Sequence, residues 1–437
     1  MQKVRGKEAI GKVSAVSPLN FSAEVRADME LPERVKLVDM SLKEGLQMEG
    51  MALSIEECLC VARKLDELGV STIKVAYRLG RPEDMELMKQ IDKLRLKAEI
   101  VVQVSNYQHP PLYSNEKKLE SIDRLVDFGY IPFVNTALSN TLLQGFAEFR
   151  GEKNKSLDYL KNLEIERSIE HVQRATKRGG RLVGNLQDPM RCDLDFLDRA
   201  CKELADAGIY YMVFDDIAMP GIPAVFKYVM RRAKKAAPGG CFGTYVHDDY
   251  GFGLGAALAS LEGGGEVHFC SINGYGKRSG MVDLGHLAVV LELMYGYDTG
   301  IHLEKLAETC TLFADIYRRP IPAIRALFGS SAFTHGADWH VQWEANPDYP
   351  NKPEHKWVPM SMAPELVGRK ARVTLYSGSG EMGIRAKAAE LGITLSIDQA
   401  EQVRSELRAE MVMRKRPLED DEFVKVLKRK LPGVEMP

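Results

Sequence analysis

The sequence predicts an α/β fold, a (β/α)8 TIM barrel followed by a C-terminal helical subdomain with a lid. Three observations carry this prediction. Eight short apolar runs alternate with amphipathic helical patterns from residue 35 onward, and polar side chains follow almost every run. The length of 437 residues suits a large barrel with an appendage.

The apolar runs begin roughly 25 to 50 residues apart, which is the spacing of strand–helix units that close into a parallel barrel. Strands buried on both faces are expected to be continuous and rich in β-branched and aromatic residues. The predicted strands are Val35–Asp39, Thr72–Ala76, Glu99–Val104, Ile131–Asn135, Arg181–Leu186, Tyr210–Asp215, Cys241–His247 and Glu266–Ile272.

The helices between these strands have recognisable start and stop signals. Ser54 and Glu57 have the spacing of a capping box, and Gly69 follows the helical pattern as a stop. Asp193–Ala207 has the same kind of signals, with a capping residue at its start and Gly208 directly after it. These signals predict helices over about 55–68 and 193–207.

The alternation of apolar runs and helical patterns ends after residue 305. The chain is expected to have three parts: an N-terminal arm at 1–30, the barrel at 31–305 and a helical subdomain at 306–437. Segments 306–327, 382–392, 396–413 and 418–431 read as helices, and 332–365 reads as an ordered loop or lid.

Composition excludes several functional classes. The formal net charge of −2 argues against a general nucleic-acid or membrane-surface binder. No apolar run approaches the length of a membrane span. The seven cysteines are scattered without a zinc-type pair, so we expect reduced thiols in a reducing cytoplasm.

Polar residues gather where the predicted strands end. In a parallel barrel these ends meet at one rim, which is where active sites lie, so one site is expected there. The candidates in chain order are Lys43, Glu44, Gln47, Lys74, Gln103, Asn185, Gln187, Asp216, Tyr245, His247 and Asn273. Of these, Glu44, His247 and Asn273 offer oxygen and nitrogen atoms that suit one divalent cation.

Several motifs occur in the order of a known superfamily. Val38–Gln47 resembles the D-[ST]-T-L-R-[DE]-G-x-Q signature of homocitrate and isopropylmalate synthases, and Tyr245–Asp249 resembles their H-x-H-N-D motif. Ile272–Gly280 is similar to the glycine-rich loop after their last strand, and Ala332–His340 to the lid segment of homocitrate synthases. The chain therefore resembles the HMG-CoA lyase-like superfamily, with a layout closest to homocitrate synthase.

The resemblance implies a Claisen-type condensation of an acyl-CoA with a 2-oxo acid, as in homocitrate, isopropylmalate and citramalate synthases, by a homodimer. It implies a divalent cation (Mg, Mn or Zn) held by Glu44 and His247. Lys43 takes the place of the signature Arg, and His335 from the lid is the candidate base. Lys74 and Tyr245 are further catalytic candidates. The substrate-binding candidates are Gln47, Gln103, Asn185, Gln187, Asp216 and Asn273.

Five substitutions set this chain apart from the superfamily pattern. Lys43 keeps the charge of the Arg but loses its bidentate fork. Lys74 and Gln187 stand where the family has Glu, Asp216 aligns with a substrate-gripping Thr, and Tyr245 replaces the first His of the metal pair.

These departures leave alternatives open. The cation is retained with help from Tyr245, Asp216 or Asp248, or the chain is a metal-independent or lysine-dependent aldolase or lyase. In the latter, Lys43 or Lys74 forms a Schiff base. A non-catalytic paralogue is a third alternative, and for Lys74 a salt bridge to Glu44 or Asp216 is the structural one. Gly276–Ser279 lacks the spacing of a P-loop but suits an anion-binding loop for a carboxylate or phosphate.

Overall fold

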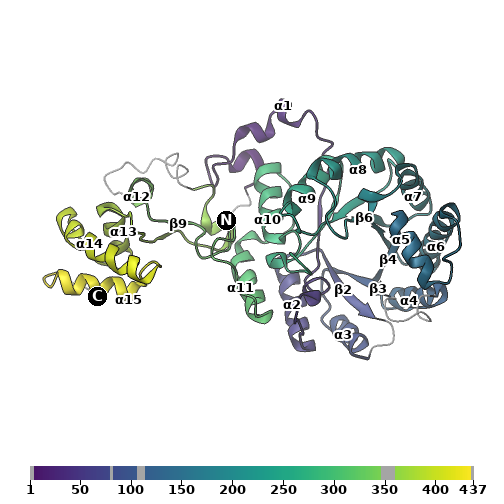
Figure 1. The fold of residues 1–437 in the computed structure, drawn as a ribbon, viewed down its shortest axis with the longest axis horizontal. Coiled ribbons are helices and arrows are strands. Elements are labelled where there is room, and N and C mark those ends of the chain that lie inside the picture. The colour runs from purple at the N-terminus through teal and green to yellow at the C-terminus, as the bar shows by residue number, and fades with distance from the viewer. Residues whose placement is uncertain (1–3, 79–81, 106–113, 346–359, 435–437) are drawn as a thin grey trace. The chain divides into compact units, whose positions relative to one another are not determined.

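The computed structural model describes residues 4–78, 82–105, 114–345 and 360–434. Its central feature is a closed barrel of eight parallel strands in sequential order, surrounded by helices (Figure 1). The predicted fold class is confirmed, and each predicted apolar run overlaps one barrel strand. The barrel strands are β1 (Lys36–Asp39), β2 (Thr72–Arg78), β3 (Glu99–Ser105), β4 (Ile131–Ala137), β5 (Val183–Gln187), β6 (Tyr211–Asp215), β7 (Phe242–Tyr245) and β8 (Val267–Cys270).

The barrel closes through pairing of its first and last strands, with Lys36–Asp39 in register with Val267–Cys270. The helices alternate with the strands and continue into the C-terminal part. They are α1 (Ala23–Arg26), α2 (Ile55–Leu68), α3 (Pro82–Lys93), α4 (Asn115–Asp127), α5 (Asn140–Phe149), α6 (Leu157–Lys177), α7 (Leu194–Asp206), α8 (Pro223–Ala236), α9 (Gly253–Glu262), α10 (Leu284–Val290), α11 (Leu306–Ile316), α12 (Asp338–Ala345), α13 (Glu381–Glu390), α14 (Ile397–Arg414) and α15 (Asp420–Lys430).

Side chains fill the barrel interior, so the barrel is a packed core and not a pore. One apolar cluster includes Val38, Val101, Phe133, Tyr245 and Phe269, from five different strands. Because side chains alternate across a strand, the same strands present a second set of residues to the surrounding helices. Functional groups on this barrel must therefore lie at a strand end or replace an interior apolar side chain.

The predicted capping signals are present. Ser54 and Glu57 form a reciprocal capping box at the start of α2, and Gly69 ends this helix with a φ of 92°. Asp193 accepts hydrogen bonds from two backbone N–H groups at the start of α7. Ser396 and Gln399 form a second capping box at α14. Local sequence thus sets where these helices begin and end.

The prediction of one helix over 306–327 is wrong in its second half. α11 ends at Ile316, and Arg318 has a left-handed φ of 50°. Pro320 and Pro322 follow at once. Proline lacks an N–H donor and disfavours helical geometry in the residue before it, so the helix cannot continue through this segment.

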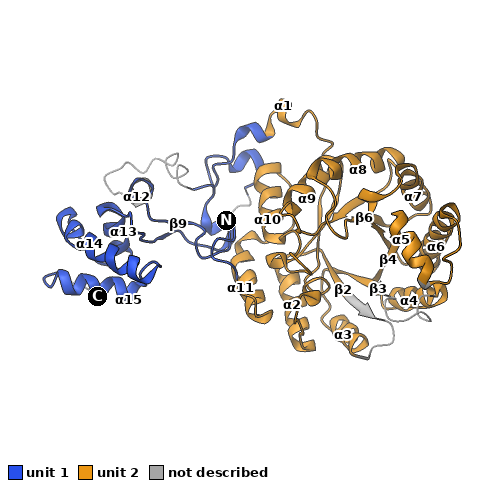
Figure 2. Cartoon of the chain, in the orientation of Figure 1, with its two compact units in different colours: residues 1–20, 321–437 blue, residues 21–320 orange. Residues whose placement is uncertain are grey.

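The chain divides into two compact units, residues 21–320 and residues 1–20 with 321–437 (Figure 2). The first contains the barrel. In the second, β9 (Thr334–His335) pairs with β10 (Arg372–Val373), and α13, α14 and α15 enclose a core that includes Leu407 and Phe423. The expected three-part division stays a prediction. Residues 346–359 of the expected lid lie outside the described residues, and no described helix is long and apolar enough to cross a membrane.

Candidate active site

The turn after β1 carries the first site residues to the rim. Asp39 ends the strand and accepts hydrogen bonds from the Ser41 backbone N–H (2.7 Å) and the Ser41 hydroxyl (3.1 Å). Burial raises the pKa of Asp39 to about 7. The backbone N–H groups of Lys43 and Glu44 then donate to the carbonyl of Met40. This tight turn orients two consecutive charged side chains into the end of the barrel.

Glu44 is the centre of a buried cluster. Its Oε1 accepts hydrogen bonds from the Lys43 ammonium and the Tyr245 hydroxyl, and Lys43 Nζ also donates to the Tyr245 oxygen at 2.8 Å. Glu44 and Tyr245 are almost completely buried. Burial opposes ionisation of Glu44, but the Lys43 ammonium, His247 and Lys277 together outweigh it and hold the pKa of Glu44 well below its usual range. The phenol of Tyr245 therefore bridges an ammonium and a carboxylate.

His247 approaches the same carboxylate from the loop after β7. Its Nδ1 lies 2.8 Å from Asp216 Oδ1, and its backbone N–H donates to Asp216 Oδ2 at 3.1 Å. A carboxylate only accepts, so this contact places a proton on Nδ1. In the neutral imidazole the Nε2 lone pair then faces Glu44 Oε2 at 3.7 Å. Burial lowers the pKa of His247, but the Asp216 and Glu44 carboxylates outweigh burial and raise it overall.

Two ligand atoms in this pair lack hydrogen-bond partners within the described part of the chain. They are Glu44 Oε2 and His247 Nε2, and both are buried. Two facing acceptors repel each other unless a proton or cation lies between them. Ligand atoms each about 2.1 Å from one ion lie no more than about 4.2 Å apart, and the observed 3.7 Å meets that limit. These residues therefore fit a divalent cation, with Asp216 orienting the imidazole.

A second possible cation group overlaps the first. Asp215, Asp216 and His247 offer ligand atoms that lie within 4.8 Å of one another, and all three residues are buried. His247 belongs to both groups. The structure thus contains a possible metal site at the ends of β6 and β7.

Amide side chains line the neighbouring strands. Asn185 donates to Asp215 Oδ2 at 2.9 Å and to Asn135 Oδ1 at 3.0 Å, and Gln103 donates to Asn135 Oδ1 at 3.2 Å. Gln187 lies 3.5 Å from Asp215 Oδ2. Three of the predicted substrate-binding residues are therefore joined through Asp215 and Asn135, as a polar wall beside the Glu44 cluster.

Lys74 does not form a salt bridge to Glu44 or Asp216, which was the structural alternative to a catalytic role. Its Nζ lies 3.1 Å from the centroid of the Phe133 ring and 5.0 Å from that of Tyr245, with no hydrogen-bond partner among the described residues. Burial, and then the nearby Lys43 charge, lower the pKa of Lys74 well below its usual value. The side chain is completely buried, so the geometry offers no support for attack by this amine on a substrate carbonyl.

Two predicted residues of the barrel unit lie outside the cluster, and a third belongs to the other unit. Gln47 is exposed on the short helix Gly45–Gln47. The Asn273 amide donates to the Cys310 carbonyl at 2.8 Å. His335 lies in β9 of the other unit, half-buried, so its role as the base stays a prediction. Asp248, named as an alternative ligand, instead accepts from the Gly253 N–H at the start of α9.

Two further residues belong to the site, and both lie where the sequence predicts the rim. Asp215 links the amide wall to His247, and Lys277 places its Nζ 3.7 Å from Glu44 Oε1. Asp215 is the last residue of β6, and Lys277 follows β8 in a glycine-rich segment. The sequence places both residues at the rim, and Lys277 in the expected anion-binding segment Gly276–Ser279, but only the structure shows the partners of the two side chains.

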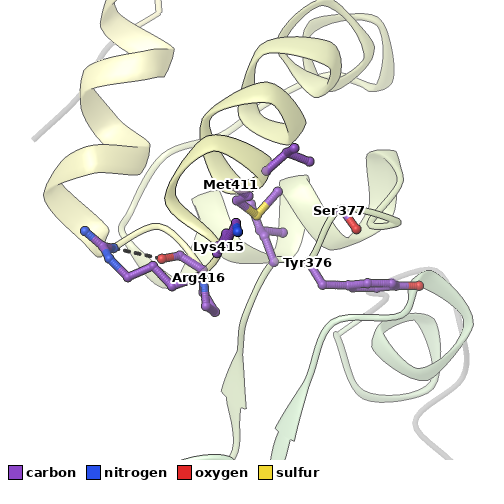
Figure 3. Close-up of a pocket in the computed structure, with 8 residues that line it drawn as sticks. Tyr376, Ser377, Met411, Lys415 and Arg416 are labelled. Carbon is purple, nitrogen blue, oxygen red and sulfur yellow. Dashed lines mark hydrogen bonds between the residues drawn. The ribbon is translucent and has the colours of Figure 1, made fainter.

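A separate cavity of about 370 Å³ lies in the other unit, between α14 and the segment after β10 (Figure 3). It is lined by Leu375, Tyr376, Ser377, Met411, Val412, Lys415, Arg416 and Pro417. None of the predicted site residues lines this cavity, and Arg416 is already paired with Glu422. The chemistry indicated above therefore belongs to the barrel rim.

The comparison with known families agrees with the geometry. A model of the HMGL-like family matches residues 34–128 and 148–312, which is more than half of the chain. The chain belongs to the HMGL-like family. The matched residues include Glu44, Asp216, Tyr245 and His247, so the cluster around Glu44 is formed by the part of the chain that defines the family.

Curated relatives of this HMGL-like protein are synthases. It is 28% identical to 2-isopropylmalate synthase of Methanocaldococcus jannaschii over 85% of this chain and 66% of that protein. It is 26% identical to a homocitrate synthase of Methanothermobacter thermautotrophicus over 90% of this chain and 92% of that protein. The fold is also that of the HMG-CoA lyase of Brucella melitensis, with a TM-score of 0.54, 18% identity, and coverage of 65% of this chain and 99% of that one.

Proposed function

We propose that this HMGL-like protein is a carbon–carbon bond-forming acyltransferase that condenses an acyl-CoA with a 2-oxo acid. The observation that carries the proposal is the pair of buried, unpartnered ligand atoms Glu44 Oε2 and His247 Nε2, 3.7 Å apart at the barrel rim. The names of the curated relatives, 2-isopropylmalate synthase and homocitrate synthase, support this reaction class.

Glu44 and His247 would hold a divalent cation, Mg, Mn or Zn, with Asp216 fixing the imidazole and Asp215 close by. When bound, such an ion supplies a Lewis acid for the keto oxygen of the 2-oxo acid. Tyr245 and Lys43 hold the second oxygen of Glu44, so the carboxylate cannot rotate away from His247.

In the proposed reaction, bonds form and break in the following order. A base takes a proton from the carbon next to the thioester, and that carbon forms a bond to the keto carbon. The π electrons of the keto group pass to its oxygen, which is then protonated. Water cleaves the thioester and releases free CoA. Buried positive charge beside the developing alkoxide, here Lys43, lowers the barrier of such a step.

Release of CoA tests the proposal directly. Acetyl-CoA and a panel of 2-oxo acids are incubated with the protein and Mg²⁺ or Mn²⁺, and free thiol is measured with a chromogenic disulfide. We expect release that depends on one or more 2-oxo acids and is lost in Glu44→Gln. Equal release without a 2-oxo acid, or from Glu44→Gln, would contradict the proposal. No release with any acid would favour the non-catalytic alternative.

Three further parts of the proposal remain: a homodimer and His335 as the base, which rest on the resemblance, and a cytoplasmic location, which rests on the scattered cysteines. All seven cysteines are free thiols, which supports a reducing compartment. Light scattering of the purified chain tests the dimer, and His335→Gln in the CoA-release assay tests the base.

A further inference from the structure

Lys277 is an ammonium group at the site whose donors are unused. It lies in the loop after β8, 3.7 Å from Glu44 Oε1, and its side chain is 34% exposed. That oxygen already accepts from Lys43 and Tyr245. Lys277 makes no hydrogen bond to another described residue, so its three N–H donors remain available.

The loop that carries Lys277 is held in place by its neighbour Arg278. The guanidinium forms a two-pronged contact with Asp249, with both N···O distances at 2.8 Å, and donates to the Ile217 carbonyl at 2.7 Å. These bonds join the loops after β6, β7 and β8. A Cβ added to Gly276 would lie 2.8 Å from Met281 Cγ, so this loop also packs closely on the barrel. Lys277 is thus placed over Glu44 by a fixed backbone.

The other two lysine side chains nearby are less accessible to an incoming carboxylate. Lys43 has a side-chain exposure of 10% and is bonded to Glu44 and Tyr245. Lys74 is completely buried against Phe133. Lys277 is therefore the accessible cation of the three, and an incoming anion meets it before it meets Glu44.

We infer that Lys277 binds the carboxylate of the 2-oxo acid. This inference rests on the proposed function. In a 2-oxo acid the carboxylate is bonded to the reacting keto carbon, whereas the phosphates of CoA lie a full pantetheine arm away from its thioester. A cation next to Glu44 is thus placed for the carboxylate. A charge-assisted N–H···O bond from Lys277 would fix this end of the substrate and turn the keto group toward Glu44 and His247.

Calorimetry on the full chain tests the inference without relying on turnover. Binding of pyruvate, 2-oxoisovalerate and 2-oxoglutarate is measured in Mg²⁺ for the wild type, Lys277→Met and Lys277→Arg. Lys161→Met serves as the matched control, because Lys161 pairs with Asp193 and neither residue is bonded to the Glu44 cluster. For the tightest-binding acid we expect at least about tenfold weaker binding in Lys277→Met, a smaller loss in Lys277→Arg and no change in Lys161→Met.

Equal affinity in Lys277→Met and wild type would overturn the inference. So would a loss of acetyl-CoA affinity with the acid unaffected, which would assign Lys277 to a CoA phosphate, and so would a wild type that binds none of the acids. An acid that binds through Lys277 while no CoA is released would uphold the inference and contradict the proposed function.

Discussion

Glu44 Oε2 and His247 Nε2 face each other at 3.7 Å, both buried and both without a hydrogen-bond partner in the described structure. We expect one divalent cation per chain at this pair, lost in both Glu44→Ala and His247→Ala. Elemental analysis of the dialysed protein measures it. Affinity should fall as pH falls, because a proton on Nε2 competes with the ion. Unchanged metal content in both variants would place the ion elsewhere.

Asp216 should affect metal binding indirectly, because it orients the His247 imidazole. It bonds to Nδ1 of the imidazole at 2.8 Å and to the His247 backbone N–H. We expect Asp216→Asn to weaken metal binding by about 10- to 100-fold, as loss of an orienting carboxylate does elsewhere. A competition titration with a fluorescent chelator gives the dissociation constant. Asp248→Asn is the control, because Asp248 caps α9 and its loss should leave the constant unchanged.

Tyr245 occupies a position where the family motif has a histidine. Tyr245→His should tighten metal binding by adding an imidazole beside Glu44, whereas Tyr245→Phe keeps the ring and removes only the hydroxyl. Because that hydroxyl bonds to both Lys43 and Glu44, we expect Tyr245→Phe to cost about 1–3 kcal/mol of unfolding free energy. Urea denaturation and the same chelator titration measure these effects. Equal metal affinity in both variants would show that position 245 does not face the ion.

Lys74 carries a buried amine with no hydrogen bond to a described residue. Replacing it with the apolar Met should raise the unfolding free energy by about 1–3 kcal/mol, since a desolvated polar group is removed. Lys43→Met should lower the unfolding free energy, because it leaves the buried Glu44 carboxylate without its ion pair. Urea melts compare the two variants. A Lys74→Met protein less stable than wild type would mean that the contact with the Phe133 ring outweighs desolvation.

Asp39 should make stability depend on pH. Burial raises its pKa to about 7, against about 3.9 in an unfolded chain. The folded protein thus retains a proton that the unfolded chain loses. The stabilising contribution of Asp39 to the unfolding free energy is complete below about pH 4. It falls by about 1.4 kcal/mol per pH unit as the pH rises to about 7.

Asp39→Asn tests this dependence, because the amide resembles the protonated acid and keeps an acceptor for the Ser41 N–H. Urea melts of both proteins at pH 5 and pH 8 give the comparison. We expect the variant to gain stability relative to wild type at the higher pH. A constant difference between the two proteins would show that Asp39 has the same pKa in both states.

Local sequence patterns determined the barrel. Its eight strands are short apolar runs with strong β propensity, and its helices begin at capping residues such as Ser54 and Asp193, so each element could be recognised from residues close together in the chain. Strand ends then predicted the rim, because parallel strands place these ends on one side. For the same reason Glu44 and His247 could be named together before their distance was known.

Only the tertiary structure decided the partners of the charged side chains. Lys74 meets the ring of Phe133 instead of a carboxylate, Asn273 turns to Cys310, and Lys277 reaches Glu44 across more than half of the chain. A charged side chain can often reach several groups of opposite charge. The residues next to it in sequence do not decide which of these groups it contacts. Strand register, barrel closure and the volume of interior rings select one partner, and these depend on residues far apart along the chain.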